Sequence, residues 1–242
     1  MTPYYQDDRA TIYNADCREV LPQLTDVGLV LTSPPYNLRN GGSLDGTKKE
    51  WSQLADGYSS YTDDLPHEDY VAWQRDVLSL CWNTLADDGA IYYQHKPITR
   101  GNAVRLPLEL VPDGMPLRQI VVWDRGSGFN RNLTHYVPSY EWVLLLTKEN
   151  FRITSRDVFD VWRIPPSKAD GHPASFPVKL ATRAIATTSA KTVLDPFMGS
   201  GTTLRAAKDC GRRSIGIEID ERYCDLAARL LSQEVLDLGD TA

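Results

Sequence analysis

Short apolar and β-branched segments alternate along this chain with longer segments in which apolar residues recur at helical spacing. The candidate strands are residues 27–32, 90–94, 117–123, 142–147, 192–195 and 214–218, and the candidate helices are residues 67–86, 176–186, 203–210 and 221–232. Such alternation is typical of a mostly parallel sheet with helices on both faces. The sequence therefore predicts an α/β fold.

The length of 242 residues and the composition, 42% hydrophobic and 24% charged, are typical of one globular domain spanning residues 1–242. No apolar run is long enough to span a membrane and no signal-peptide pattern opens the chain, so we expect a cytoplasmic protein without membrane contact. The net charge of −6 excludes a protein that coats nucleic acid through bulk electrostatics. The four cysteines and four histidines show no metal-ligand spacing, so no metal site is expected. His67, His95 and His135 are interpreted as structural or solvated, and a place lining the site is the alternative for His95.

Residues 192–203, with the sequence TVLDPFMGSGTT, run from a strand through a glycine-rich turn into a helix. The next strand ends at Glu218. This is the layout of a nucleoside-binding crossover, in which glycines let the backbone approach the ligand and the later acid binds ribose hydroxyls. Asp195 at the mouth of the turn would repel a pyrophosphate, and Leu204 replaces the third glycine of the dinucleotide pattern. A phosphate-free nucleoside such as S-adenosylmethionine fits better.

The tetrapeptide Ser33-Pro34-Pro35-Tyr36 follows the first apolar strand. Two prolines fix the backbone and remove two N–H donors, so that carbonyl oxygens are left to accept hydrogen bonds. Ligands of parallel sheets bind at the carboxyl ends of the strands. The Ser33 oxygen, the Pro34 carbonyl and the Tyr36 ring therefore suit a planar amine.

Together, the two motifs resemble those of the amino-methylating DNA methyltransferases of the permuted, or beta, class, in which the catalytic motif precedes the cofactor motif. The resemblance covers most of the chain and implies a Rossmann-like, S-adenosylmethionine-dependent methyltransferase fold with circularly permuted motif order. It assigns catalysis to Ser33, Pro34, Pro35 and Tyr36. It assigns the cofactor to Asp16, Cys17, Asp195, Pro196, Phe197, Gly199, Gly201, Thr202 and Glu218, and to Phe176, in a segment at residues 172–179 that opens a helix over the methionine end.

The mechanism implied is direct transfer of a methyl group to the exocyclic amine of a flipped base, without a metal or a covalent enzyme intermediate. Two acceptors, Ser33 and the Pro34 carbonyl, would bind the amine hydrogens, and Tyr36 would stack on the ring. The family tends to use Ser at the first motif position for cytosine, so N4 of cytosine is preferred and N6 of adenine is the alternative. A protein or small-molecule amine methyltransferase, and an idle nucleic-acid binder, are less favoured interpretations.

Contacts to DNA are predicted for Asn37, Arg125, Arg131, Arg152 and Arg156, the arginines because residues 118–156 are locally basic. The polar stretch at residues 37–66 is interpreted as a loop, and residues 149–171 as a short target-recognition insert. The sequence leaves open whether the protein forms a homodimer and whether a cognate restriction endonuclease is its partner.

Overall fold

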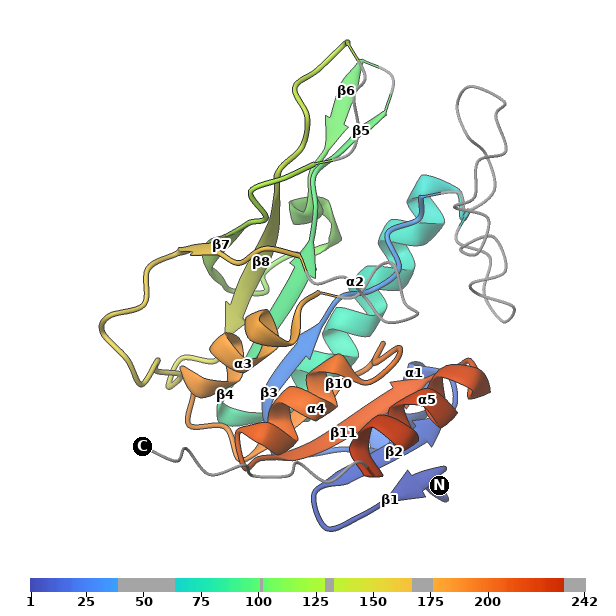
Figure 1. Cartoon of the computed structure of the whole chain (residues 1–242). Coiled ribbons are helices and arrows are strands. Elements are labelled where there is room, and N and C mark those ends of the chain that lie inside the picture. Colours follow the sequence, from blue (N-terminus) through green and yellow to red (C-terminus); the bar gives the residue numbers. More distant parts are fainter. Residues whose placement is uncertain (39–63, 101, 129–132, 167–175, 233–242) are drawn as a thin grey trace.

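The computed structural model describes residues 1–38, 64–100, 102–128, 133–166 and 176–232. Its centre is one nine-stranded sheet, shown in Figure 1. In spatial order the strands are β1 (Tyr5–Gln6), β2 (Ala10–Asn14), β11 (Arg213–Glu218), β10 (Thr192–Asp195), β3 (Val27–Thr32), β4 (Leu85–His95), β8 (Tyr140–Thr147), β7 (Leu117–Asp124) and β9 (Val161–Arg163).

Five neighbouring strands, from β2 through β11, β10 and β3 to β4, run parallel, whereas β8 is antiparallel to both β4 and β7. The predicted mostly parallel α/β sheet is confirmed. From β3 the chain continues outward to β4, and from β10 it continues in the opposite direction to β11. The strand order therefore reverses between β3 and β10, and open α/β sheets bind ligands at such a point.

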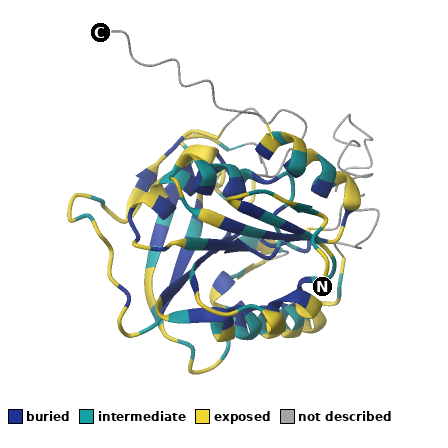
Figure 2. Ribbon diagram, turned by 90° about the horizontal axis from the view of Figure 1, so that it is seen from below, coloured by how far each residue is buried: buried dark blue, intermediate teal, exposed yellow. Residues whose placement is uncertain are grey.

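Helices cover both faces of the sheet, and Figure 2 shows buried residues along the strands and exposed residues on the outer helix surfaces. The helices are α1 (Cys17–Val20), α2 (His67–Thr84), α3 (Val178–Ala186), α4 (Thr202–Asp209) and α5 (Glu221–Ser232). Residues of α1 and α2 pack in one core cluster, and residues of α3 and α4 pack in another across the sheet. A third cluster joins α4 and α5 to β2. The helices therefore form a layer on each side of the sheet.

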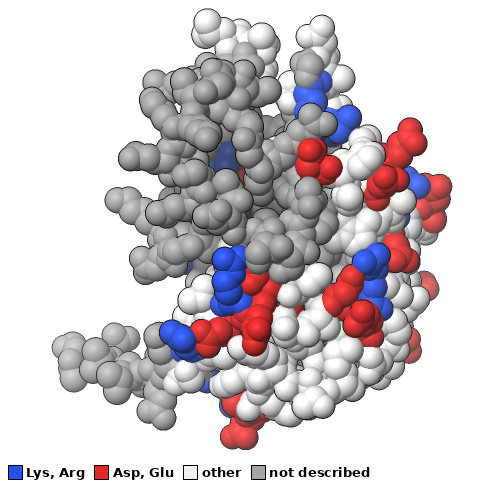
Figure 3. All heavy atoms as spheres, turned by 90° about the vertical axis from the view of Figure 1, so that its right-hand side faces the viewer, with Lys and Arg blue, Asp and Glu red and all other residues white. Residues whose placement is uncertain are grey.

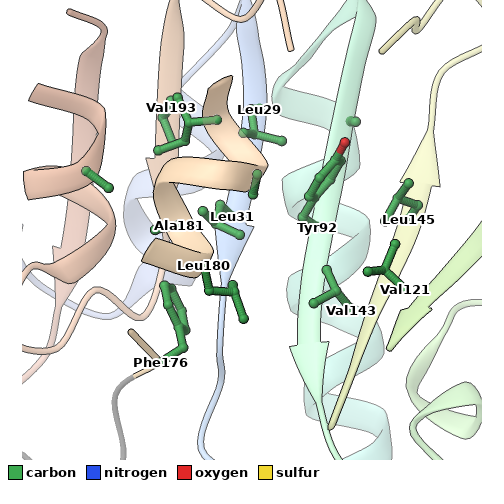
Figure 4. Close-up of a cluster of buried hydrophobic side chains, with 14 of the residues drawn as sticks. Leu29, Leu31, Tyr92, Val121, Val143, Leu145, Phe176, Leu180, Ala181 and Val193 are labelled. Carbon is green, nitrogen blue, oxygen red and sulfur yellow. The ribbon is translucent and has the colours of Figure 1, made fainter. Parts of the chain in front are cut away.

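The alternation of side chains along the central strands explains the two main clusters. Leu29 and Leu31 of β3 face α3, together with Tyr92 of β4, and Figure 4 shows Leu31 beside Leu180. Val30 and the residues on either side of Tyr92 face α2 instead. Because both faces are buried, these strands are almost continuously apolar, which is the signal that the sequence carries.

All six predicted strands and four predicted helices are present, and their ends differ by a few residues. The helix expected over residues 67–86 ends at Thr84 because β4 begins at Leu85 and pairs with β3 from there. The sequence pattern does not predict α1, β1, β2 and β9, the 3₁₀ helices η1 (Leu21–Gln23) and η3 (Pro107–Leu110), or the separate hairpin of β5 (Ile98–Arg100) and β6 (Ala103–Arg105). These are short elements, and their small hydrophobic faces give little periodic signal.

Candidate active site

The two sequence motifs meet where the strand order reverses, because the tetrapeptide follows β3 and the glycine turn follows β10. The Thr32 hydroxyl donates a hydrogen bond of 2.7 Å to Asp195 Oδ1. Asp195 Oδ2 accepts from the Thr203 hydroxyl of α4 at 2.6 Å. One buried carboxylate thus joins the catalytic strand, the cofactor turn and the helix after it.

Asp195 is almost fully buried, and burial raises the pKa of its carboxyl to about 6. The Phe197 amide adds a third hydrogen bond, at 3.1 Å. Asp195 Oδ1 accepts hydrogen bonds from Thr32 and Phe197, and Oδ2 accepts one from Thr203, so both carboxylate oxygens bind residues of the protein. Asp195 therefore holds the turn in shape, and the surface that faces a ligand is formed by the residues after it.

The glycine turn relies on backbone conformations that side chains disfavour. Gly199 and Gly201 have φ values of 52° and 89°, in the left-handed region that glycine adopts freely. A Cβ at Gly201 would lie 2.8 Å from the Ala227 Cβ of α5, so there is also no room for a side chain. The turn can therefore bring its backbone close to a ligand, which a larger residue at either position would prevent.

Glu218, at the end of β11, closes the other side of this turn. Its Oε2 accepts from the Gly199 amide and its Oε1 from the Asp220 amide, both at 3.0 Å. Burial raises the pKa of Glu218 to about 7, despite these bonds. The carboxyl is thus held at the carboxyl edge of the sheet, adjacent to the turn, in a partly protonated state near neutral pH.

The remaining predicted cofactor residues lie at the same edge. Asp16 caps α1 and binds Arg18 through its side chain, which holds the pKa of the Asp16 carboxyl below its usual value. Cys17 is buried, and burial raises the pKa of its thiol to about 12. The Phe197 ring packs edge-on against Trp73 of α2, 5.6 Å between centroids. Phe176 lies just before α3, beyond the Leu31 end of β3 in Figure 4.

The tetrapeptide end of the site is built from residues distant in sequence. The Tyr36 hydroxyl lies 3.0 Å from the Ser33 Oγ, and it donates to Gln94 Oε1 at 2.6 Å, with Glu141 Oε2 at 3.2 Å. The Gln94 amide nitrogen donates to Glu141. Arg125 pairs with Glu141 at 3.1 Å, with the two side chains 18% and 8% exposed. We call Tyr36, Gln94, Glu141 and Arg125 the polar row, and it crosses the ends of β3, β4, β8 and β7.

Aromatic residues from α2 and β4 support the tetrapeptide on the other face of the sheet. The His95 ring lies 4.4 Å from the Tyr36 ring, centroid to centroid. Burial lowers the pKa of His95 to about 4, so that it is neutral at physiological pH. The Tyr70 hydroxyl lies 2.9 Å from His95 Nε2 and donates to the Pro35 carbonyl at 2.8 Å. The backbone of the tetrapeptide is thereby fixed from α2.

The predicted DNA contacts do not gather at one place. Asn37 is buried and adopts a left-handed conformation, and its amide exchanges hydrogen bonds of 2.8 and 2.7 Å with the Leu65 backbone. Arg125 reaches the correct edge, but it is bound to Glu141 and to the Pro138 carbonyl. Both side chains therefore have structural partners where the sequence suggested DNA.

Arg152 lies at the opposite edge of the sheet, because β8 runs antiparallel to β4 and ends beside Ala90. Its guanidinium donates to the Glu149 and Phe151 carbonyls at 2.8 and 2.7 Å. Arg156 belongs to the same exposed segment. The described part of the expected target-recognition insert, residues 149–166, contains β9, which extends the sheet by pairing with β7 and has a buried Trp162. Arg131, residues 39–63 of the expected loop and residues 167–171 of the insert lie outside the described residues.

Tyr70, Gln94 and Glu141 are not predicted from the sequence as site residues, and His95 is assigned to the site only as the alternative interpretation. A signal existed for Glu141, a carboxylate at the start of an otherwise apolar strand, and for the Gln94-His95 pair at the end of another. No local pattern connects these positions, because the contacts join residues 58 and 105 apart in sequence. Within the described residues, no group of His, Cys, Asp and Glu could hold a metal ion. No helix in this part of the chain is long and apolar enough to cross a membrane.

A family model and several known proteins match most of this chain. Residues 27–229 match the model of the DNA methylase family that comprises N6- and N4-methyltransferases. The chain belongs to this family. The DNA methyltransferase is 29% identical over 280 residues to the Type II methyltransferase M.ScaI of Streptomyces caespitosus, covering 98% of the chain and 86% of the relative. It is 26% identical over 268 residues to M.BglII of Bacillus subtilis, covering 92% and 69%.

Solved structures show the same fold. The PvuII DNA methyltransferase, described as cytosine-N4-specific, superimposes with a TM-score of 0.72 at 20% identity over 96% of both chains. A complex of M1.HpyAVI with S-adenosylmethionine gives a TM-score of 0.61 at 20% identity, over 91% of this chain and 98% of that one. The DNA methyltransferase is S-adenosylmethionine-dependent and acts on DNA.

The residues around the glycine turn fit this cofactor. S-adenosylmethionine carries an ammonium, a sulfonium and ribose hydroxyls but no phosphate. Glu218 and Asp220 place two buried carboxyl groups at and just after the end of β11, beside a turn that admits close backbone contact, and the Asp220 carboxylate is paired with Arg222 at 2.8 Å. A pyrophosphate would be repelled by the same carboxylates. These carboxyl groups therefore favour a cationic nucleoside as the ligand.

Proposed function

We propose that this DNA methyltransferase methylates the exocyclic N4 amine of cytosines flipped out of the DNA stack. The observation that carries the proposal is the hydrogen-bond arrangement of Ser33, the first residue of the tetrapeptide. An exocyclic amine is a weak nucleophile because its lone pair is delocalised into the ring. A site that activates it needs acceptors for the amine hydrogens, and Ser33 is arranged to be one.

Counting donors along the polar row gives the direction of each bond. The carboxylate of Glu141 can only accept, so the Gln94 amide turns its nitrogen to Glu141 and its oxygen to Tyr36. The single hydrogen of the Tyr36 hydroxyl is therefore used on Gln94 or Glu141. Toward Ser33, 3.0 Å away, Tyr36 can act only as an acceptor, and the Ser33 hydrogen points to it.

The consequence for the reaction is that Ser33 presents lone pairs, and no hydrogen, to the substrate. A second acceptor is the Pro34 carbonyl, to which no other described residue donates, whereas Tyr70 occupies the Pro35 carbonyl. Two acceptors on the amine hydrogens favour a pyramidal nitrogen whose lone pair points along the transfer direction. S-adenosylmethionine, when bound, supplies the methyl group on an electrophilic sulfonium.

The Tyr36 ring has one face against His95, and its other face is proposed to stack on the flipped base. The chain's contribution to rate is positioning and electrostatics: Ser33 and Pro34 orient the amine, and the buried polar row keeps those acceptors fixed. The proton that leaves the methylated amine can be relayed: Ser33 takes it as the Ser33 hydrogen passes to Tyr36, and the Tyr36 hydrogen passes to the Glu141 carboxylate.

The choice of cytosine rests on Ser33 and is consistent with the fold shared with the cytosine-N4-specific PvuII enzyme. N6 methylation of adenine by the same residues is the alternative. The Type II names of the relatives support a further proposal, that a restriction endonuclease reads the same site.

The test is to incubate the purified enzyme with unmodified DNA and S-adenosylmethionine, digest the DNA and identify the nucleosides by mass spectrometry. N4-methylcytosine is expected, and a Ser33→Ala variant of equal thermal stability should form much less of it. N6-methyladenine as the product would overturn the assignment to cytosine.

A further inference from the structure

The β5–β6 hairpin projects from the sheet at the edge that carries the tetrapeptide, and Figure 1 shows it reaching beyond the other strands. It begins three residues after His95, the last residue of β4. Ile98 pairs with Arg105 and Arg100 pairs with Ala103. Because cross-strand partners and residues two apart share a face, Ile98, Arg100 and Arg105 lie on one face of the hairpin.

That face lines a pocket of about 320 Å³, part of which is open to solvent. The opposite walls are Tyr36, Tyr70 and His95, the aromatic residues that surround the tetrapeptide. Arg100 donates a hydrogen bond to the Asn37 carbonyl, directly after Tyr36. The hairpin is therefore tied to the catalytic residues, and its cationic face opens onto the same space as the Tyr36 ring.

The charge in this pocket is unbalanced. Glu109 is the acidic side chain among its described lining residues, and it lies 3.0 Å from His67 Nε2. No described carboxylate pairs with Arg105, which is half-buried. Figure 3 shows basic side chains at the top of the described surface, at the level of the hairpin. A partly desolvated guanidinium without a carboxylate partner favours an anionic ligand.

We infer that the β5–β6 hairpin is a phosphate-binding arm, in which Arg105, with Arg100 beside it, contacts the DNA backbone next to the flipped nucleotide. This rests on the proposed function, because a base stacked on Tyr36 stays attached to its two flanking phosphates. Those phosphates must lie within one nucleotide of Tyr36, and the hairpin arginines border that space. Guanidinium groups bind phosphates through paired N–H donors.

The first test is the salt dependence of DNA affinity, measured with a fluorescent duplex for the wild type and three variants. Arg105→Gln should lower the slope of log K against log[salt] by about 0.9, the value for one lost phosphate contact, and weaken binding at low salt about fivefold. Arg105→Lys keeps the charge and should retain the slope. Arg213→Gln, which removes an exposed arginine at the start of β11, at the opposite edge of the sheet, should match the wild type.

A second measurement uses the wild-type enzyme and does not depend on the stability of a variant. Arginines are modified with phenylglyoxal with and without DNA, and the modified peptides are identified by mass spectrometry. DNA should protect Arg105 and leave Arg213 reactive. An unchanged slope for Arg105→Gln, or equal reactivity of Arg105 with and without DNA, would overturn the inference. The proposed function would survive either result as long as the same preparation forms N4-methylcytosine, and its own failure would appear only in the nucleoside analysis.

Discussion

The cofactor turn and the tetrapeptide lie side by side at one edge of the sheet, but different interactions hold them. Around the turn, Asp195 and Glu218 are buried acids that accept hydrogen bonds from nearby backbone and threonine groups, and burial raises the pKa of each. At the tetrapeptide, the buried acid Glu141 has a cationic partner, Arg125. The first arrangement should be sensitive to pH, and the second to the loss of a single charged partner.

The largest effect is expected where the tetrapeptide meets the substrate. Ser33→Ala removes one acceptor for the target amine and should lower the single-turnover rate of methyl transfer about 100-fold, the usual effect of losing one oriented group in a transition state. S-adenosylmethionine affinity should change less than about twofold, because Ser33 lies outside the cofactor turn. A parallel loss of cofactor affinity would contradict the separation of the two regions.

The buried charge pair gives the next largest effect. Glu141→Gln leaves the Arg125 guanidinium, in a side chain only 18% exposed, without its carboxylate and should lower the free energy of unfolding by about 3 kcal/mol, as measured by urea denaturation. The matched control is Asp225→Asn, which breaks the Arg229 pair on α5 whose side chains are 73% and 46% exposed. That pair lies in solvent and should contribute about 0.3 kcal/mol. Equal losses in the two variants would show that burial does not distinguish these pairs.

The cofactor turn should respond to pH through Glu218. Its pKa of about 7 means that the carboxyl is mostly protonated at pH 6 and mostly ionised at pH 8. If the cationic cofactor binds the ionised form, affinity should rise about tenfold over this range and then level off. Calorimetric titration at several pH values measures this change, and Glu218→Gln should abolish it. A flat profile for the wild type would remove Glu218 from the cofactor site.

The smallest effect concerns the opposite edge of the sheet. Arg152→Gln should leave DNA affinity and its salt dependence unchanged, because Arg152 follows the far end of β8 and donates to backbone carbonyls there. A loss of DNA affinity in gel-shift titrations, with unchanged thermal stability, would show that DNA wraps beyond the tetrapeptide edge.

The two regions also differ in how far the sequence predicts them. The turn, with the strand before it and the start of the helix after it, is encoded in consecutive residues 192–203, so it could be assigned from the sequence. The core strands could also be assigned, from their continuous apolar runs. The polar row could not, because Tyr36, Gln94, Glu141 and Arg125 come from four separate strand ends that only the sheet order brings together. The arrangement of the sheet also explains the position of Arg152. The basic composition around Arg152 predicts a DNA contact, but the direction of β8 places this residue at the edge of the sheet away from the site.

The double hydrogen bond between the Asn37 amide and the Leu65 backbone fixes two points of the chain that are 28 residues apart. These two hydrogen bonds therefore hold the residue after Tyr36 against the residues before α2. The entropy of closing such a connection grows slowly, by about 0.6 kcal/mol for each doubling of its length. Because Asn37 directly follows Tyr36 and Leu65 lies two residues before α2, this contact sets how the tetrapeptide lies relative to α2.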